Sequence, residues 1–159
     1  MLFVHSLEMK RVNLSFEIQE CSEKELSSSD RELLSCAKKS AINAYAPYSK
    51  FKVGSAVLLE NGKIISGNNQ ENAAYPSGLC AERVALFFAS SQYPKEKIKA
   101  LAITNVPCGA CRQTILEYES KQKSLTRIIM LKEKSKILIS EGISNLLPLS
   151  FGNKELKKV

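Results

Sequence analysis

The chain has 159 residues, 44% hydrophobic and 25% charged, a composition typical of a single globular domain. No apolar run approaches the roughly 18 residues that cross a bilayer, and the first residues lack a secretory signal pattern, so we expect a cytoplasmic protein without a membrane partner. The net charge of +7 comes from scattered lysines with no interleaved aromatic residues, so we expect no nucleic-acid groove.

The first predicted elements are a strand and a helix. Residues 11–20 alternate loosely between polar and apolar residues, which is compatible with an extra edge strand. Ser29 and Glu32 have the spacing of a capping box, and apolar residues recur at helical spacing after them. This helix should end near Pro47, because the residue before a proline resists the helical conformation.

A hairpin and a series of alternating elements follow. The dipeptide Asn61-Gly62 between two apolar segments, 52–60 and 63–69, predicts a β-hairpin. The remaining predicted elements are a helix at 80–91, a strand at 97–104, a helix at 108–119, strands at 124–131 and 136–140, and a short helix at 142–147.

Strands that alternate with helices predict an α/β fold with helices on both faces of a sheet. The last two predicted strands are separated only by residues 132–135. A parallel crossover needs about a dozen residues, so these two strands should pair antiparallel.

The cysteines point to a metal rather than to disulfides. There are five, an odd number in a chain without a secretory signal. Cys21 and Cys36 stand alone and are interpreted as buried, inert thiols. Cys80, Cys108 and Cys111 fall in two short motifs, each at the start of a predicted helix, where the helix dipole stabilises thiolates.

Three thiol ligands predict a catalytic zinc site. A structural zinc site closes all four coordination positions with protein ligands, whereas a catalytic one leaves a position open for water. The only histidine, His5, is far from the cysteines in sequence, and no fourth ligand is apparent.

Charged residues next to the cysteines suggest further roles. Glu82 lies two residues after Cys80, so its carboxylate would lie beside the zinc-bound water and could move protons. Alone, it would be interpreted as an ordinary carboxylate at a helix N-terminus. Arg83 and Arg112 each follow a motif and are candidates to offset the negative charge of three thiolates, with a surface ion pair as the simpler alternative.

The motif Cys-Ala-Glu followed by Pro-Cys-x-x-Cys resembles the zinc nucleoside and nucleobase deaminases. Four stretches in order, 45–56, 67–83, 107–113 and 146–152, resemble the cytidine deaminase family in particular. The resemblance covers roughly residues 30–155. Two departures are a segment of only Asn105-Val106 before Pro107, where the family usually has a longer loop, and a long N-terminal segment.

The resemblance implies a three-layer α/β/α cytidine deaminase-like fold with a mixed five-stranded sheet whose last strand pair is antiparallel. It divides the chain into an N-terminal extension, 1–29, and a single zinc-dependent deaminase domain, 30–159. It also implies one zinc per subunit and a homotetramer whose active sites are completed across subunits.

The resemblance also implies roles for individual residues. It assigns zinc binding to Cys80, Cys108 and Cys111, general acid/base catalysis to Glu82, the ribose 3′-hydroxyl to Asn69 and Glu71, stacking near the pyrimidine to Phe51, the base edge to the backbone of Ala81, and a neighbouring subunit's pocket to Tyr75 and Phe151. Taken singly, the asparagine, glutamate and phenylalanine would be interpreted as a loop-stabilising, a surface and a core residue.

The implied reaction is hydrolytic deamination of free cytidine and deoxycytidine in pyrimidine salvage, with release of ammonia. Three alternatives remain. A deaminase of RNA, DNA or tRNA more often has His in place of Cys80 and a parallel final strand pair. A deaminase of a cytosine-bearing antibiotic differs in pocket shape. A non-enzymatic zinc module would need a fourth protein ligand.

Overall fold

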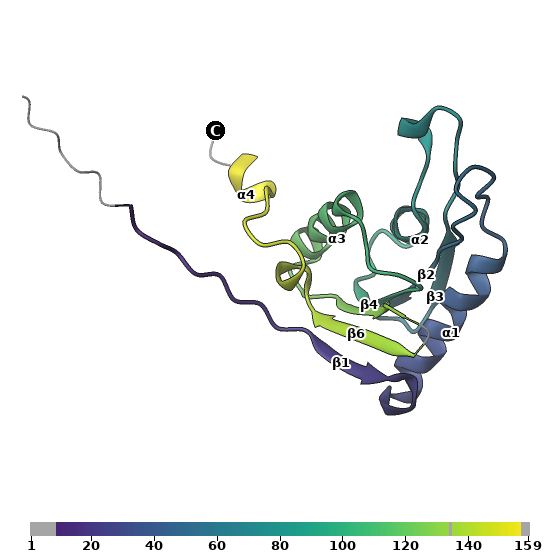
Figure 1. Ribbon diagram of the computed structural model, residues 1–159, viewed down its shortest axis with the longest axis horizontal. Coiled ribbons are helices and arrows are strands. Elements are labelled where there is room, and N and C mark those ends of the chain that lie inside the picture. The colour runs from purple at the N-terminus through teal and green to yellow at the C-terminus, as the bar shows by residue number, and fades with distance from the viewer. Residues whose placement is uncertain (1–8, 134, 157–159) are drawn as a thin grey trace, which may run out of the picture.

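The computed structural model describes residues 9–133 and 135–156, which form a mixed six-stranded sheet with helices on both faces (Figure 1). The strand order is β1-β6-β5-β4-β2-β3. The strands are β1 Gln19–Ser22, β2 Gly54–Leu59, β3 Ile64–Asn68, β4 Ile98–Ile103, β5 Arg127–Leu131 and β6 Lys136–Glu141. The helices are α1 Ser28–Ile42, α2 Ala81–Gln92, α3 Gly109–Gln122 and α4 Asn153–Leu156, with 3-10 turns η1 Glu23–Glu25, η2 Tyr75–Ser77 and η3 Ile143–Asn145.

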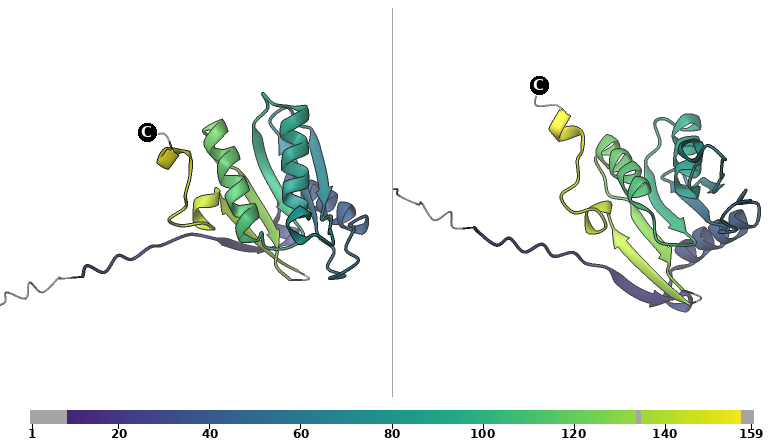
Figure 2. Two further views of the ribbon diagram at one scale, coloured as in Figure 1. Left: turned by 90° about the horizontal axis from the view of Figure 1, so that it is seen from above. Right: turned by 45° about the horizontal axis from the view of Figure 1, so that its top comes forward.

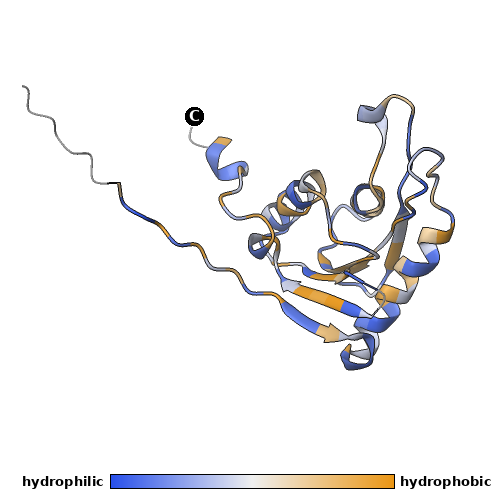
Figure 3. Ribbon diagram, viewed as in Figure 1, coloured by the Kyte–Doolittle hydropathy of each residue, from blue (hydrophilic) through white to orange (hydrophobic). Residues whose placement is uncertain are grey.

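Two cores lie on opposite faces of the sheet. Because side chains alternate along a strand, β4 sends Ala100 and Ala102 toward α1, and Leu101 and Ile103 toward α2 and α3. Figure 2 shows α2 and α3 side by side on one face, with α1 on the other. Figure 3 shows the apolar residues concentrated on the strands between these helices. The predicted three-layer α/β/α arrangement is confirmed.

The strand directions also agree with the sequence. β5 and β6 pair antiparallel, with Met130 opposite Leu138. β4 and β5 pair parallel and are joined through α3. The sheet is therefore mixed, as expected, but it has six strands rather than five, because β1 joins it.

The extra edge strand lies later in the chain than expected. It was predicted at residues 11–20, whereas β1 spans Gln19–Ser22 and pairs antiparallel with β6. Cys21 packs against the core under α1, which fixes the strand at this point. The predicted segment overlaps β1 only at its last two residues, since residues 11–17 are exposed and lie outside the sheet.

The start of α1 also corrects the sequence reading. Ser27, not Ser29, caps the helix and accepts a hydrogen bond from the backbone N–H of Asp30 at 3.1 Å. Ser29 lies within the first turn. The helix ends at Ile42, some residues before Pro47.

The predicted hairpin is confirmed. β2 and β3 pair antiparallel around the turn at Asn61-Gly62, and Gly62 has φ of +83°. Glycine adopts this left-handed conformation without the steric cost that a Cβ imposes. The turn fixes the register that brings Gly54 opposite Asn68.

Two glycines allow helices to lie close against the hairpin. A Cβ at Gly54 would lie 2.0 Å from the Ala37 carbonyl oxygen in α1. A Cβ at Gly67 would lie 2.6 Å from the backbone nitrogen of Ala85 and 2.9 Å from the Ala81 carbonyl oxygen. The absent side chain of Gly67 therefore lets the first turn of α2 contact β3.

Within residues 9–133 and 135–156, no helix is long and apolar enough to cross a membrane.

Candidate active site

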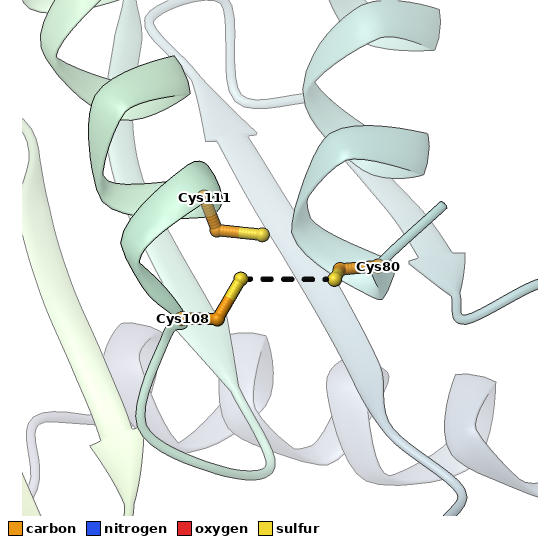
Figure 4. Close-up of side chains that lie close together, drawn as sticks. All are labelled: Cys80, Cys108 and Cys111. Atoms are coloured by element: carbon orange, nitrogen blue, oxygen red, sulfur yellow. Dashed lines mark hydrogen bonds between the residues drawn. The ribbon is translucent and has the colours of Figure 1, made fainter. Parts of the chain in front are cut away.

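Three cysteine side chains meet where α2 and α3 begin. Cys80 is the N-cap of α2, Cys108 is the N-cap of α3, and Cys111 lies in the first turn of α3. Figure 4 shows the three thiols directed toward one another from the two helices. The Sγ atoms of Cys80 and Cys108 are 3.8 Å apart, and all three sulfurs lie within 4.8 Å of one another. The two motifs, separated in sequence, thus form one cluster.

The cluster fits a zinc ion. Tetrahedral zinc with Zn–S bonds of about 2.3 Å holds its sulfur ligands about 3.8 Å apart. The separation of Cys80 and Cys108 already has that value. Among the described residues, no other group of histidine, cysteine or acidic side chains is arranged to bind a metal, and His5 lies outside them. Three protein ligands leave one tetrahedral position for water.

The cluster favours a thiolate at Cys80, at the start of α2. A hydrogen bond with Cys111, followed by one with Arg83, lowers the pKa of the Cys80 thiol to about 5. Hydrogen bonding with Cys80 and burial raise the pKa of Cys111. Negative charge therefore resides first on Cys80, whose sulfur lies at the positive end of α2. A thiolate is the form of cysteine that binds zinc.

Glu82 lies in the first turn of α2, next to these sulfurs. Its side chain is buried, and its carboxyl group interacts with Cys80 and Cys111. Burial raises the pKa of this carboxyl group, because a buried carboxylate loses hydration. A carboxyl group with a raised pKa is suited to both accepting and donating a proton near neutral pH.

A cavity opens beside the cluster. Its volume is about 490 Å³, which is within the range of small-ligand sites. Its walls are residues of the loops before α2 and between α1 and β2, together with the first turn of α2. They are Tyr48, Ser49, Asn69, Gln70, Glu71, Asn72, Tyr75, Gly78, Leu79, Cys80 and Arg83. Three predicted substrate contacts, one predicted zinc ligand and the predicted arginine thus line the same space.

Glu71 ties the two loops of the cavity together. Its Oε2 accepts hydrogen bonds from the backbone N–H groups of Tyr48 at 2.8 Å and Ser49 at 3.2 Å. Its Oε1 accepts a hydrogen bond from the Ser49 hydroxyl group. Hydrogen bonding with Ser49 lowers the pKa of the Glu71 carboxyl group, so Glu71 is held as a carboxylate. Tyr48 and Ser49 both lie in the stretch 45–56, but no sequence pattern marks either of them as part of the site.

Asn69 supports the strand entering β2. Its Oδ1 accepts from the Val53 backbone N–H at 2.8 Å, and its Nδ2 donates to the Phe51 carbonyl oxygen at 2.9 Å. The loop-stabilising interpretation of Asn69 therefore has direct support. A second lone pair and a second amide hydrogen remain for a ligand, so its predicted contact with a sugar hydroxyl stays a prediction.

Comparison with known proteins identifies the family. The model of the cytidine and deoxycytidylate deaminase zinc-binding region matches residues 27–126, more than half of the chain. The chain belongs to this deaminase family. The cytidine deaminase of Mycobacterium tuberculosis is 32% identical over 128 residues, which cover 77% of this chain and 89% of that protein. The cytidine deaminase of Sporosarcina psychrophila is 47% identical over 93 residues, 55% of this chain and 68% of that protein.

Solved structures of cytidine deaminases have the same fold. The crystal structure of the enzyme from Burkholderia pseudomallei superposes with a TM-score of 0.68 at 35% identity, covering 76% of this chain and 97% of that chain. The crystal structure of the Mycobacterium tuberculosis enzyme gives a TM-score of 0.64 at 30% identity, covering 79% and 99%. The predicted cytidine deaminase fold and family are therefore confirmed, and the three cysteines form the zinc-type site of this deaminase.

Arg83 lies beside the cysteine cluster of the deaminase site. Its Nη2 donates to the Gly78 carbonyl oxygen at 3.1 Å and contacts the Cys80 sulfur at 3.9 Å. Its Nε is buried and has no hydrogen-bond partner among the described residues. The guanidinium therefore lies beside the Cys80 sulfur, and the role of Arg83 in offsetting the thiolate charge stays a prediction.

Arg112 has a different part in the deaminase domain. Its Nε donates to the Pro107 carbonyl oxygen at 2.9 Å, and its Nη1 donates to that of Leu146 at 2.8 Å. These bonds tie the short segment before α3 to the turn after β6. Val106 in that segment packs against the core, so the shortened approach to the metal site is held firmly.

The three remaining predicted contacts lie outside the wall of the cavity. Phe51 is 56% exposed on the loop that Asn69 holds. Ala81 is fully buried in the first turn of α2. Phe151 is 60% exposed in the segment before α4, where Gln113 donates to its carbonyl oxygen. Tyr75, which does line the cavity, is 80% exposed. Their predicted roles in this deaminase stay predictions.

Proposed function

We propose that this chain hydrolyses free cytidine and deoxycytidine to uridine and deoxyuridine, with release of ammonia, in pyrimidine salvage. The observation that carries the proposal is the meeting of Cys80, Cys108 and Cys111 at two helix starts with the buried carboxyl group of Glu82 beside them. Membership of the deaminase family supports the same reaction.

The chemistry divides between a metal and a carboxyl group. Zinc held by the three cysteines would supply Lewis-acid activation of a water molecule. Glu82 takes a proton from the attacking water and delivers it to N3 of the cytosine ring, while the water oxygen forms a bond to C4. Glu82 then takes the proton of the new C4 hydroxyl group and gives it to the amino group, so the C4–N bond breaks, one water is consumed and one ammonia is released.

The cavity beside the sulfurs accommodates the nucleoside. Glu71 is a carboxylate on the cavity wall and is suited to accept a hydrogen bond from a sugar hydroxyl. Asn69 offers a donor and an acceptor next to it. In the proposed complex, Phe51 and the Ala81 backbone, which lie outside the cavity wall, would contact the pyrimidine ring and the base edge. No group in this set requires a 2′-hydroxyl, which is why deoxycytidine is included.

We also propose a homotetramer with one zinc per subunit, in which Phe151 and Tyr75 complete a neighbour's active site. Both aromatic rings are largely exposed in the single chain, and each lies in a stretch that resembles the cytidine deaminases. A ring that closes another subunit's pocket would lose this exposure. A cytoplasmic location stays a prediction.

Free nucleosides are favoured over polynucleotides by two features. Cys80 occupies the ligand position where polynucleotide deaminases more often have histidine. The β5–β6 pair is antiparallel, which separates the sheet from one with a parallel final pair. A closed structural zinc site is disfavoured, because within residues 9–133 and 135–156 the metal cluster has three members.

A substrate panel tests the proposal. The zinc-loaded full chain is incubated separately with cytidine, deoxycytidine, deoxycytidylate, adenosine and a single-stranded oligonucleotide, and ammonia is measured. We expect release from the two free nucleosides. Release from the oligonucleotide alone would refute the free-nucleoside assignment, and no release from any substrate at full zinc occupancy would favour a structural zinc module. A Cys108→Ser preparation provides the background rate.

A further inference from the structure

The N-terminal arm, defined as residues 9–18, extends away from the rest of the molecule. Figures 1 and 2 show it leading outward from the start of β1, with no helix or strand of the domain beside it. No hydrogen bond joins residues 9–16 to the rest of the described chain. Glu17 alone makes one, from its backbone N–H to Asn145 Oδ1 at 3.3 Å. Along most of its length, the arm therefore has backbone donors and acceptors without a partner among the described residues.

The arm carries an uncovered apolar face. Val12, Leu14 and Phe16 alternate with polar residues, so an extended backbone directs all three side chains to one side. Their side chains are 74%, 53% and 65% exposed. An extended segment with an apolar face and unpaired backbone groups is a template for pairing with another strand. The arm thus has the chemistry of a strand that lacks its partner.

The arm is complementary to itself in antiparallel register. When two copies pair about a two-fold axis through Leu14, Arg11 of each copy lies opposite Glu17 of the other. Val12 then lies opposite Phe16, and Leu14 lies opposite its own counterpart. Opposite charges, and apolar residues, facing each other across strands stabilise a pair, whereas like charges destabilise it. Pairing with a second copy therefore gives the apolar face of the arm apolar partners and the charged residues of its polar face oppositely charged partners.

We propose that the arms of two copies of this chain pair as an antiparallel β-ribbon centred on Leu14. A two-fold contact of this kind is isologous, so each arm contributes the same residues to both halves of the interface. The Arg11–Glu17 pairs set the register, and the apolar residues bury one another. The inference does not depend on the proposed reaction, because no arm residue belongs to the zinc site or its cavity.

Disulfide trapping tests the register directly. Directly opposite residues of an antiparallel pair have Cα atoms about 4.5 to 5.5 Å apart, within the reach of a disulfide. Leu14→Cys should therefore form a homotypic 14–14 cross-link under mild oxidation of the full chain. The matched control is Val12→Cys, because its two copies would be offset by four residues, about 13 Å. A mixture of Val12→Cys and Phe16→Cys chains should form the 12–16 cross-link. Cross-linked peptides are identified by mass spectrometry, with the unmodified chain as the background for native cysteines.

Charge exchange provides an independent readout. Arg11→Glu in the Leu14→Cys chain would put two glutamates opposite each other at both ends of the ribbon. The yield of the 14–14 cross-link at limiting protein concentration should fall roughly tenfold, since two symmetric charge pairs are reversed. Adding Glu17→Arg should restore it. Comparable 12–12 and 14–14 yields, absence of the 14–14 link in folded protein, or no recovery in the double exchange would each overturn the proposal.

Discussion

Glu82 and Cys80 are only two residues apart, yet the start of α2 gives them different environments. Cys80 is the N-cap, and its sulfur joins the cluster, whereas Glu82 is within the first turn and its carboxyl group is buried. The carboxyl group therefore lies beside the metal site while three sulfurs already supply the protein ligands. This arrangement is what a proton-transferring group requires.

Glu82→Gln separates the two roles. The amide keeps the size of the side chain but cannot accept and return a proton, so we expect kcat to fall by roughly 100- to 10,000-fold. Zinc content should remain at one per chain by elemental analysis. The matched control is Glu117→Gln, an exposed carboxylate on α3, which should leave both quantities unchanged. Loss of zinc in the Glu82 variant would mean that Glu82 is a ligand and that its assigned role is wrong.

For individual residues, the sequence predicts the cysteine cluster well and the hydrogen bonds of the cavity loops poorly. The cysteine cluster follows from two local motifs, each at a helix start. Such short-range patterns can be identified from the sequence without knowledge of the tertiary structure. The bonds from Glu71 to Tyr48 and Ser49 join residues more than twenty positions apart, so no spacing rule indicates them. The bond between Asn69 and Val53 spans sixteen positions and likewise follows from no local spacing.

Helix boundaries depend on the core as well as on local caps. Three consecutive serines, Ser27 to Ser29, lie at the start of α1, and the spacing with Glu32 favours the last of them as the cap. Leu26 is buried in the core under α1, so the chain has already turned inward one residue before Ser27. Ser27 therefore becomes the cap. The tertiary contact decides between local signals of similar strength.

Bound zinc should stabilise the folded chain by linking the first turns of α2 and α3. Without metal, a thiolate at Cys80 lies close to the other two sulfurs. Zinc binding would replace this contact between sulfur atoms with zinc–sulfur bonds. We expect Cys108→Ser to lose zinc and to unfold at a lower temperature than the zinc-loaded chain. Chelation should cost about 4 kcal/mol of unfolding free energy relative to free zinc at about a thousand times its Kd.

Cys36→Ala is the matched control for that experiment. Cys36 lies in α1, on the opposite face of the sheet, and is not part of the sulfur cluster. The zinc content of this variant should be unchanged. Its thermal midpoint should therefore not show the fall that metal loss causes in Cys108→Ser. Equal zinc loss in both variants would exclude the assigned ligand set.

Glu119 connects α3 to two segments that follow it. Its Oε1 accepts from the backbone N–H of Thr126 at 2.9 Å and of Ile143 at 3.1 Å. Burial raises the pKa of this carboxyl group, because the charged form loses hydration. A raised pKa in the folded state means that its contribution is fully present below the ordinary glutamate pKa and is lost as pH rises through the raised value.

Glu119→Gln should therefore change how stability depends on pH. Glutamine keeps a carbonyl oxygen for the same two N–H groups and does not ionise. We expect the parent chain to lose unfolding free energy relative to the variant as pH rises above the ordinary glutamate pKa. Urea unfolding across that window, with zinc present, measures the difference. Glu117→Gln should run parallel to the parent, and parallel curves for Glu119→Gln would contradict the interpretation.

For the whole molecule, strand direction was more predictable than strand number. The short connection between β5 and β6 excludes a crossover, so their antiparallel pairing follows from chain length alone. β1 has only four residues, and its pairing with β6 depends on a partner more than a hundred positions away. Its weak alternation extends into the arm, which is why the sequence placed the strand too early.

Subunit mixing tests whether active sites are completed between chains. Glu82→Gln chains lack the proton-transferring group but keep Phe151, whereas Phe151→Ala chains have the opposite defect. If Phe151 serves a neighbour's pocket, both variants are weak alone, and a mixed assembly contains intact sites. An equal mixture, after dissociation and reassociation with zinc, should recover about a quarter of parent activity, since half the sites keep Glu82 and half of those receive Phe151. If each pocket used its own Phe151, mixing would give only the average of the two variants. Glu117→Gln chains keep both Glu82 and Phe151. Mixed with Phe151→Ala chains they calibrate the effect of assembly itself, since about half of the sites then have both groups.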